Sequence, residues 1–131
     1  MNKDLEAKLT KRFPGIFADM YGNPRETCMA FGCECSDGWF DLLFRLCEDI
    51  EKAEKADDTH KFKALQIKEK FGTLSFYYVG GNDEIHSLVS AAERESGKIC
   101  ERCGSREDVT TEGPGWILTL CGICREKKNA G

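Results

Sequence analysis

The sequence lacks the features that mark several large classes of protein. It has no run approaching the roughly 20 apolar residues that a membrane-spanning helix requires. The segment from Met1 to Glu6 is polar where a signal peptide would be apolar, so we expect a cytoplasmic protein. Neither of the two histidines lies in an H-E-x-x-H motif, and Gly80-Gly81 belongs to no Walker or G-x-G-x-x-G loop. The sequence therefore gives no support to a membrane span, a zinc protease or a glycine-rich phosphate loop.

Positive charge is not in excess either. The 131 residues include 19 Lys and Arg against 23 Asp and Glu, a formal net charge of −4. Non-specific nucleic-acid affinity depends on clustered cations. The charge balance therefore argues against nucleic acid as a partner of this protein. Apolar residues, in contrast, make up 40% of the chain and include eight Phe. This content is sufficient for one compact domain, or one domain with a small appendage.

The apolar pattern predicts helices and a β-hairpin. Apolar residues recur at three- and four-residue spacing, typical of amphipathic helices, in three segments: 4–12, 38–56 and 83–97. Alternation over 62–71 and the β-rich run 73–79 predict a hairpin with Gly72 between its strands. Residues 28–35 are expected to be irregular or briefly extended. We therefore predict an α+β domain over residues 1–97, with helices packed on a small antiparallel sheet or hairpin.

Four of the eight cysteines form two spaced pairs near the C-terminus. These pairs, Cys100/Cys103 and Cys121/Cys124, are C-x-x-C motifs separated by 17 residues. Two thiolates in one tight turn can bind the same tetrahedral metal, and a second turn completes its shell. β-prone segments lie between the pairs. We predict a zinc ribbon over residues 98–131 with one structural zinc ion, since four thiolates leave no open position for catalysis.

The remaining cysteines show no such order. Cys28, Cys33 and Cys35 are candidate ligands for a second metal, with Cys47 or His60 as the fourth. Their C-x4-C-x-C spacing matches no common zinc knuckle, and Cys47 lies on the apolar stripe of the predicted helix. Buried thiols are therefore the favoured interpretation.

An aromatic run in the second predicted strand is a candidate ligand-binding surface. Neighbouring side chains on a strand point to opposite faces, so either Tyr77 is displayed while Phe76 and Tyr78 are buried, or the reverse. Exposed rings beside Lys68 and Lys70 would suit stacking on a base with a cation near its phosphate. Packing beneath the helices is the alternative use of the same rings.

Several segments resemble a family of small uncharacterised zinc-ribbon proteins of phages and bacteria. The resemblance lies in the paired C-x-x-C motifs, the run Ile67–Tyr77 with the sequence IKEKFGTLSFY, Thr27-Cys28, Asp37–Phe40 and Gly115–Ile117. It covers most of the chain. It implies an accessory protein acting in a host cytoplasm if phage-encoded, and it implies no catalytic residues.

Three functions remain open on these observations. The first is a non-enzymatic binder that sequesters a host factor, either a protein or a nucleotide-like signal molecule, with anti-defence as one such role. The second is a nucleic-acid-binding or transcription-linked module, for which only Arg125, Lys127 and Lys128 form a basic cluster. The third is a nucleotide-processing enzyme that uses Asp83, Glu84 and His86. An exposed aromatic surface would also suit a homodimer.

Overall fold

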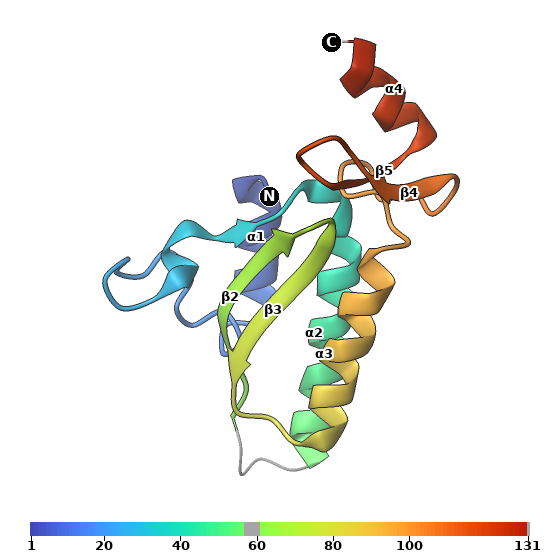
Figure 1. Ribbon diagram of the computed structural model, residues 1–131. Coiled ribbons are helices and arrows are strands. Elements are labelled where there is room, and N and C mark those ends of the chain that lie inside the picture. Colours follow the sequence, from blue (N-terminus) through green and yellow to red (C-terminus); the bar gives the residue numbers. More distant parts are fainter. Residues whose placement is uncertain (57–60, 131) are drawn as a thin grey trace.

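The computed structural model describes residues 1–56 and 61–130 and has an α+β architecture (Figure 1). Its helices and strands are α1 (Lys3–Arg12), η1 (Cys28–Phe31), β1 (Cys33–Glu34), η2 (Asp37–Trp39), α2 (Phe40–Ala56), β2 (Lys63–Lys70), β3 (Thr73–Val79), α3 (Asp83–Ser96), β4 (Val109–Glu112), β5 (Leu118–Cys121) and α4 (Gly122–Ala130). The predicted α+β class is confirmed. None of the helices in the described part of the chain has the length and apolar character needed to cross a bilayer.

A three-stranded sheet in the order β1-β2-β3 forms the centre of the N-terminal body. The predicted hairpin is present: β2 and β3 are antiparallel and join through Phe71 and Gly72, which both have positive φ, as in a type I′ turn. β1 pairs with β2 in parallel, with Cys33 opposite Ile67. A brief extended stretch within residues 28–35 was expected, but its pairing with β2 was not, because residues 34 positions apart carry no local hairpin signal.

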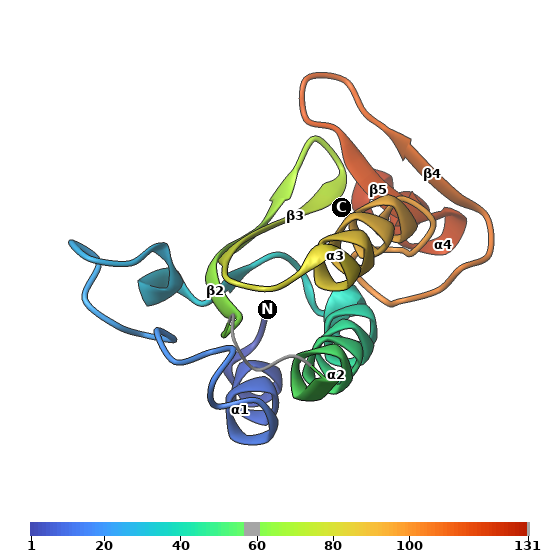
Figure 2. The same cartoon turned by 90° about the horizontal axis from the view of Figure 1, so that it is seen from below.

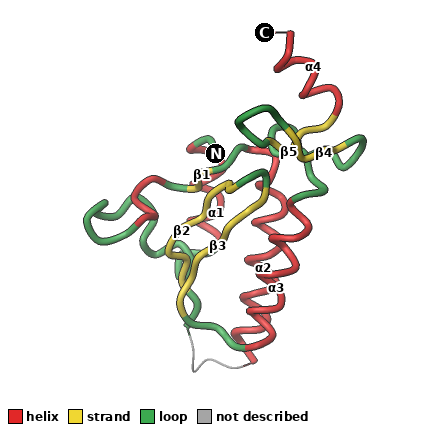
Figure 3. Tube along the Cα trace, in the orientation of Figure 1, coloured by secondary structure: helices red, strands yellow, loops and turns green. Residues whose placement is uncertain are grey.

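The core lies between one face of this sheet and three helices. Figures 1 and 2 show α1, α2 and α3 together on one side of the sheet, and Figure 3 shows the same arrangement by element type. The largest fully buried side chains include Trp39, Phe13 and Phe17. From the sheet, Ile67 and Leu74 point into this core. Among the described residues, no helix covers the opposite face of the sheet (Figures 1 and 2).

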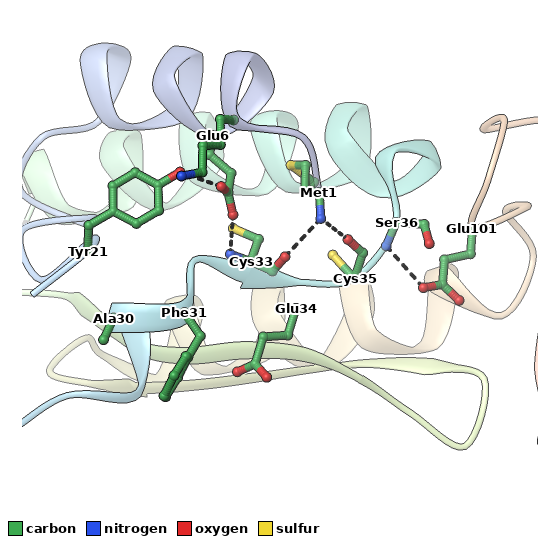
Figure 4. Close-up of a pocket in the computed structure, with 11 residues that line it drawn as sticks. Met1, Glu6, Tyr21, Ala30, Phe31, Cys33, Glu34, Cys35, Ser36 and Glu101 are labelled. Atoms are coloured by element: carbon green, nitrogen blue, oxygen red, sulfur yellow. Dashed lines mark hydrogen bonds between the residues drawn. The ribbon is translucent and has the colours of Figure 1, made fainter. Parts of the chain in front are cut away.

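Helix side chains cap both free edges of the sheet. On β1, the buried carboxylate of Glu6 from α1 accepts a hydrogen bond from the Cys33 amide, and the Tyr21 hydroxyl donates to the same carboxylate (Figure 4). On β3, the Leu74 amide donates to Ser96 Oγ at 2.9 Å, and the Phe76 amide donates to a Glu93 carboxylate at 2.9 Å. Unpaired edges recruit further strands, so these contacts disfavour pairing with another chain at either edge.

Because Ser96 caps β3, alanine substitutions at two serines of α3 should affect the free energy of unfolding differently. Ser96→Ala should lower the free energy of unfolding by about 1–3 kcal/mol, because the buried Leu74 amide loses its acceptor. Ser90→Ala, on the exposed side of the same helix, should be neutral or slightly stabilising because Ala favours helix. Urea unfolding of the two variants measures both values. Equal stabilities would contradict the assigned role of Ser96.

Candidate metal centre

The four ribbon cysteines meet at one point of the structure. The ligand atoms of Cys100, Cys103, Cys121 and Cys124 all lie within 4.8 Å of one another. Cys103 Sγ and Cys121 Sγ are 3.7 Å apart, and all four thiols are free of disulfides. The group can therefore hold a metal ion. As a set of four sulfur donors it would fill a tetrahedral shell and leave no open position for a substrate or a water molecule.

Two tight turns bring these thiols together. In the first, the Cys100 amide donates to the Ser105 carbonyl at 2.8 Å, and the Gly104 amide donates to the Cys100 carbonyl at 2.9 Å. Gly104 has a φ of 81°, a conformation that side chains rarely adopt. In the second, Cys121 ends β5, and the Cys124 amide donates to its sulfur at 3.4 Å from the start of α4. Both knuckles are thus fixed by backbone contacts.

The surroundings of the thiols differ. Burial alone would raise the pKa of Cys100, but backbone amides of Cys103, Cys121 and Arg102 donate toward its sulfur and lower the pKa to about 7. Burial and the neighbouring thiols raise the pKa of Cys124 to about 12. Backbone donors therefore favour a thiolate at the first ligand position in the absence of metal.

The rest of the ribbon is a short hairpin braced by one arginine. β4 and β5 pair antiparallel, with Val109 opposite Cys121. From α4, Arg125 Nη2 donates to the Thr110 carbonyl at 2.8 Å and to the Leu118 carbonyl at 3.1 Å. The basic cluster proposed for nucleic-acid contact is thereby reduced, because Arg125 bonds within the ribbon. The helix α4 itself was not predicted, since its nine residues, which include the last candidate ligand Cys124, give too short a pattern.

The first knuckle is joined to the body by the segment that starts α2. The Gly38 amide donates to the Glu101 carbonyl at 2.6 Å, and Trp39 Nε1 donates to the Ile99 carbonyl at 3.0 Å. The buried Glu101 carboxylate accepts from the Ser36 amide at 3.0 Å, and burial raises the pKa of Glu101. Sequence reasoning missed this role of Glu101, because a charged residue inside a C-x-x-C motif normally faces solvent.

The β2–β3 turn makes a second junction with the ribbon. The buried Thr119 hydroxyl donates to the Gly72 carbonyl and lies 2.7 Å from the Thr111 hydroxyl. The Gly38 and Gly72 contacts thus place segments 37–40 and 67–77 at the two junctions with the ribbon. The domain boundary between residues 97 and 98 stays a prediction. In the described residues, several hydrogen bonds join the two sides of this boundary.

The aromatic run is divided between the two faces of the sheet. Phe76 is buried in the core, and Tyr78 lies on the same side, where its hydroxyl is 2.6 Å from His86 Nδ1. Tyr77 points to the uncovered face and is 46% exposed. Of the two predicted arrangements, the structure has the one in which Tyr77 is displayed. Phe76 and Tyr78 point to the helix side, so they cannot contribute to a site on the uncovered face. Lys68 and Lys70 lie on β2 on the same face as Tyr77.

The other candidate residues do not assemble. Cys33, Cys35 and Cys47 are buried, whereas Cys28 is exposed, and burial raises the pKa of Cys33 to about 12. Among the described residues, the ribbon cysteines are the only group of three or more ligands close enough to share a metal. His60, the alternative fourth ligand, lies outside the described residues. Cys33, Cys35 and Cys47 are therefore buried free thiols, as the sequence favoured, and burial raises the pKa of Cys35 and Cys47 as well.

Two cavities of the described residues have no lining from Lys68, Lys70 or Tyr77 of the uncovered face. One, of about 650 Å³, lies along β1 and is lined by residues that include Glu6, Tyr21 and Glu101 (Figure 4). The other, of about 610 Å³, has Phe13 and Ile16 in its wall. Lys68, Lys70 and Tyr77 line neither cavity, so the uncovered face presents these residues on its surface rather than in a deep pocket.

No family model, curated protein or solved structure matches this chain.

Proposed function

We propose that this chain is a non-catalytic binding protein in which a structural zinc ion fixes the ribbon on the body and the uncovered face of the sheet holds a partner. The observation that carries the proposal is the position of Tyr77, which is 46% exposed on the uncovered face, pairs with Gln66 and has Lys68 as its diagonal neighbour on β2, with Lys70 further along the same strand. An exposed aromatic side chain surrounded by polar groups is typical of binding surfaces.

Zinc is the metal that best suits the four cysteines. In a tetrahedral site with zinc–sulfur distances of about 2.3 Å, neighbouring sulfurs are about 3.8 Å apart. The separation of 3.7 Å between Cys103 Sγ and Cys121 Sγ supports this assignment. A four-thiolate site also suits iron, which metal analysis distinguishes from zinc. When bound, the metal cross-links the two knuckles, and the thiolate side chains supply the charge that holds it.

A binding role fits the surroundings of the titratable groups better than catalysis does. The His86 ring is stacked on Tyr78 at 5.6 Å between centroids and shares a hydrogen bond with the Tyr78 hydroxyl. Asp83 and Glu84 lie in the first turn of α3, where negative charge stabilises the helix dipole. These residues therefore have structural roles, and we propose no reaction for them.

The partner we propose is a protein rather than a small nucleotide-like molecule. Small-molecule sites are usually concave and bury most of the ligand, whereas Tyr77 and its neighbouring lysines line neither large cavity. The capped edges also disfavour a partner that adds a strand. In the phage setting that the resemblance implies, this partner is a host protein.

Tyr77→Ala is expected to abolish partner binding while the protein stays folded. The side chain is exposed, so the substitution should cost less than about 1 kcal/mol of stability. Native mass spectrometry of tagged protein purified from host cells should show a stoichiometric protein partner on the wild type and none on Tyr77→Ala.

Tyr77→Phe provides the matched control, because it keeps the ring and loses only the hydroxyl. It should retain most of the binding. A partner that remains on Tyr77→Ala, or a substrate turned over by the wild type, would contradict the proposal.

A further inference from the structure

The uncovered face of the sheet has a charge opposite to that of the chain as a whole. We call it the outer face and define it by the outward side chains of the three strands: Glu34, Lys63, Gln66, Lys68, Lys70, Thr73, Ser75, Tyr77 and Val79. Three of these are lysines and one is a glutamate, on a protein with a net charge of −4. Lys63 is paired with Asp19 at 3.1 Å. In the described part of the chain, Lys68 and Lys70 have no ion pair.

Exposed aromatic side chains extend this surface at both ends. Phe31, next to β1, is 66% exposed, and Figure 4 shows it on the side of β1 away from Glu6, together with Glu34. At the other end, Phe71 in the β2–β3 turn is 73% exposed. Together with Tyr77, these two phenylalanines leave apolar area unburied at separate points of the surface, as expected for a surface that a partner covers.

Phe71 is held in a conformation that disfavours its residue type. Its φ is 54°, in the left-handed region, where a bulky side chain is a genuine outlier and costs about 1–2 kcal/mol. Asn followed by Gly is the preferred pair for such a turn. The exposed ring returns no packing energy to the fold. A strained and exposed Phe71 is therefore a candidate contact residue for a partner.

The ribbon continues the apolar area beyond the turn. A Cβ placed on Gly72 would lie 3.3 Å from Ile117 Cγ2, so the residue after Phe71 is in contact with the β4–β5 loop. Ile117 is 38% exposed, and Trp116 beside it is 71% exposed. Because the Thr119 hydroxyl donates to the Gly72 carbonyl, the ribbon is held against the turn that carries Phe71, and Trp116 and Ile117 lie in the loop next to it.

We propose that the outer face, with Phe71 and Trp116 at its ribbon end, binds an acidic segment of a partner protein that carries apolar side chains. This inference rests on the proposed function and names the partner chemistry. Carboxylates of the segment would face Lys68 and Lys70, and its apolar side chains would cover Tyr77, Phe71 and Trp116. Aromatic anchors inside a charged rim are typical of protein interfaces.

The charge of the outer face disfavours two alternative occupants, a second copy of this chain and a single-stranded nucleic acid. A second copy docked through the same face would bring its own Lys68 and Lys70 toward those of the first, which is unfavourable in a two-fold interface. A single-stranded nucleic acid has a phosphate at every nucleotide and needs cations along its path. The outer face offers it only two unpaired lysines, and Glu34 lies in register beside Lys68.

A selection for peptides tests the inference without a known partner. Random peptides displayed on a carrier are selected on the zinc-loaded chain, and the recovered peptide is synthesised with a fluorescein label for anisotropy titration. We expect the recovered peptides to combine Asp or Glu with Leu, Phe or Trp. Their affinity should fall as salt increases. Labelled oligothymidylate serves as the nucleic-acid probe, and sedimentation velocity reports self-association.

Two pairs of variants locate the peptide. Phe71→Asn should weaken binding roughly tenfold or more. The same variant should leave the melting temperature unchanged or higher, because Asn-Gly suits the turn. Lys68→Glu/Lys70→Glu should weaken binding by a similar factor, whereas Lys8→Glu/Lys11→Glu, which changes the charge equally on exposed positions of α1, should not.

The outcomes separate the inference from the proposed function. Binding of oligothymidylate that is lost in Tyr77→Ala overturns the acidic-protein partner but keeps the outer face as a binding surface. Self-association that Phe71→Asn abolishes likewise overturns the acidic-protein partner but keeps the outer face as a binding surface. Acidic peptides that bind Phe71→Asn and Lys68→Glu/Lys70→Glu as tightly as the wild type overturn the inference. Failure of every probe on the outer face, together with a native partner retained by Tyr77→Ala, overturns both.

Discussion

Cys121→Ser is expected to unfold the ribbon while the N-terminal body keeps most of its structure. The buried cluster of the ribbon consists of Leu120 and three of the four clustered cysteines, Cys100, Cys121 and Cys124. So small a core cannot hold a segment of about 30 residues, and a structural zinc ion contributes about 10–16 kcal/mol to folding in zinc-finger peptides. Losing one ligand should therefore remove most of the stability of this segment.

Amide hydrogen exchange measures this loss residue by residue. Residues 100–124 of Cys121→Ser should exchange at rates close to those of an unfolded chain, and removal of metal from the wild type by a chelator should have the same effect. Cys28→Ser is the control, because Cys28 is exposed and lies outside the cluster. Protection of the ribbon in metal-free protein would contradict a structural role for the metal.

Gly38→Ala is expected to destabilise the protein by about 3 kcal/mol through a clash at the junction. A Cβ at this position would lie 2.2 Å from the Cys100 carbonyl oxygen and 2.4 Å from the Glu101 carbonyl oxygen. Both are backbone atoms, and the Glu101 carbonyl is held by its hydrogen bond from the Gly38 amide. The first knuckle must therefore move away from α2, which displaces the ligand Cys100.

Gly15→Ala is the matched control for this substitution. A Cβ at Gly15 would have nothing within 4 Å, so this change should be neutral or stabilise the protein by up to about 1 kcal/mol. Urea unfolding gives the stabilities, and competition with a zinc chelator gives the metal affinity, which should fall only in Gly38→Ala. Equal behaviour of the two variants would show that the junction does not constrain the knuckle.

Local pattern was sufficient to predict much of this fold. The two C-x-x-C pairs, the alternation on either side of Gly72 and the three- and four-residue spacing in α2 each depend on neighbours within one element. These signals predicted the thiol group that can hold a metal, the β2–β3 hairpin and the longest helix. The alternation rule also limited Tyr77 to two arrangements, but it did not indicate which face the helices would cover.

The contacts that join distant segments were not predictable in the same way. Glu6 belongs to a charged helix and would be expected to face solvent, yet its carboxylate caps an edge strand 27 residues away. Gly38 resembles an ordinary residue at a helix start, and only its packing against Cys100 makes a larger side chain impossible. Each role depends on a partner brought near by the tertiary fold, so no local pattern contains it.

The central claim is that one zinc ion holds the ribbon on the body, and native mass spectrometry of the intact chain tests it most directly. The account predicts a mass increase equal to one zinc ion per chain for protein purified without added metal, with elemental analysis excluding iron. It also predicts that this increase disappears in Cys121→Ser and remains in Cys28→Ser. Folded wild-type protein that carries no metal, or that carries iron in place of zinc, would contradict the account.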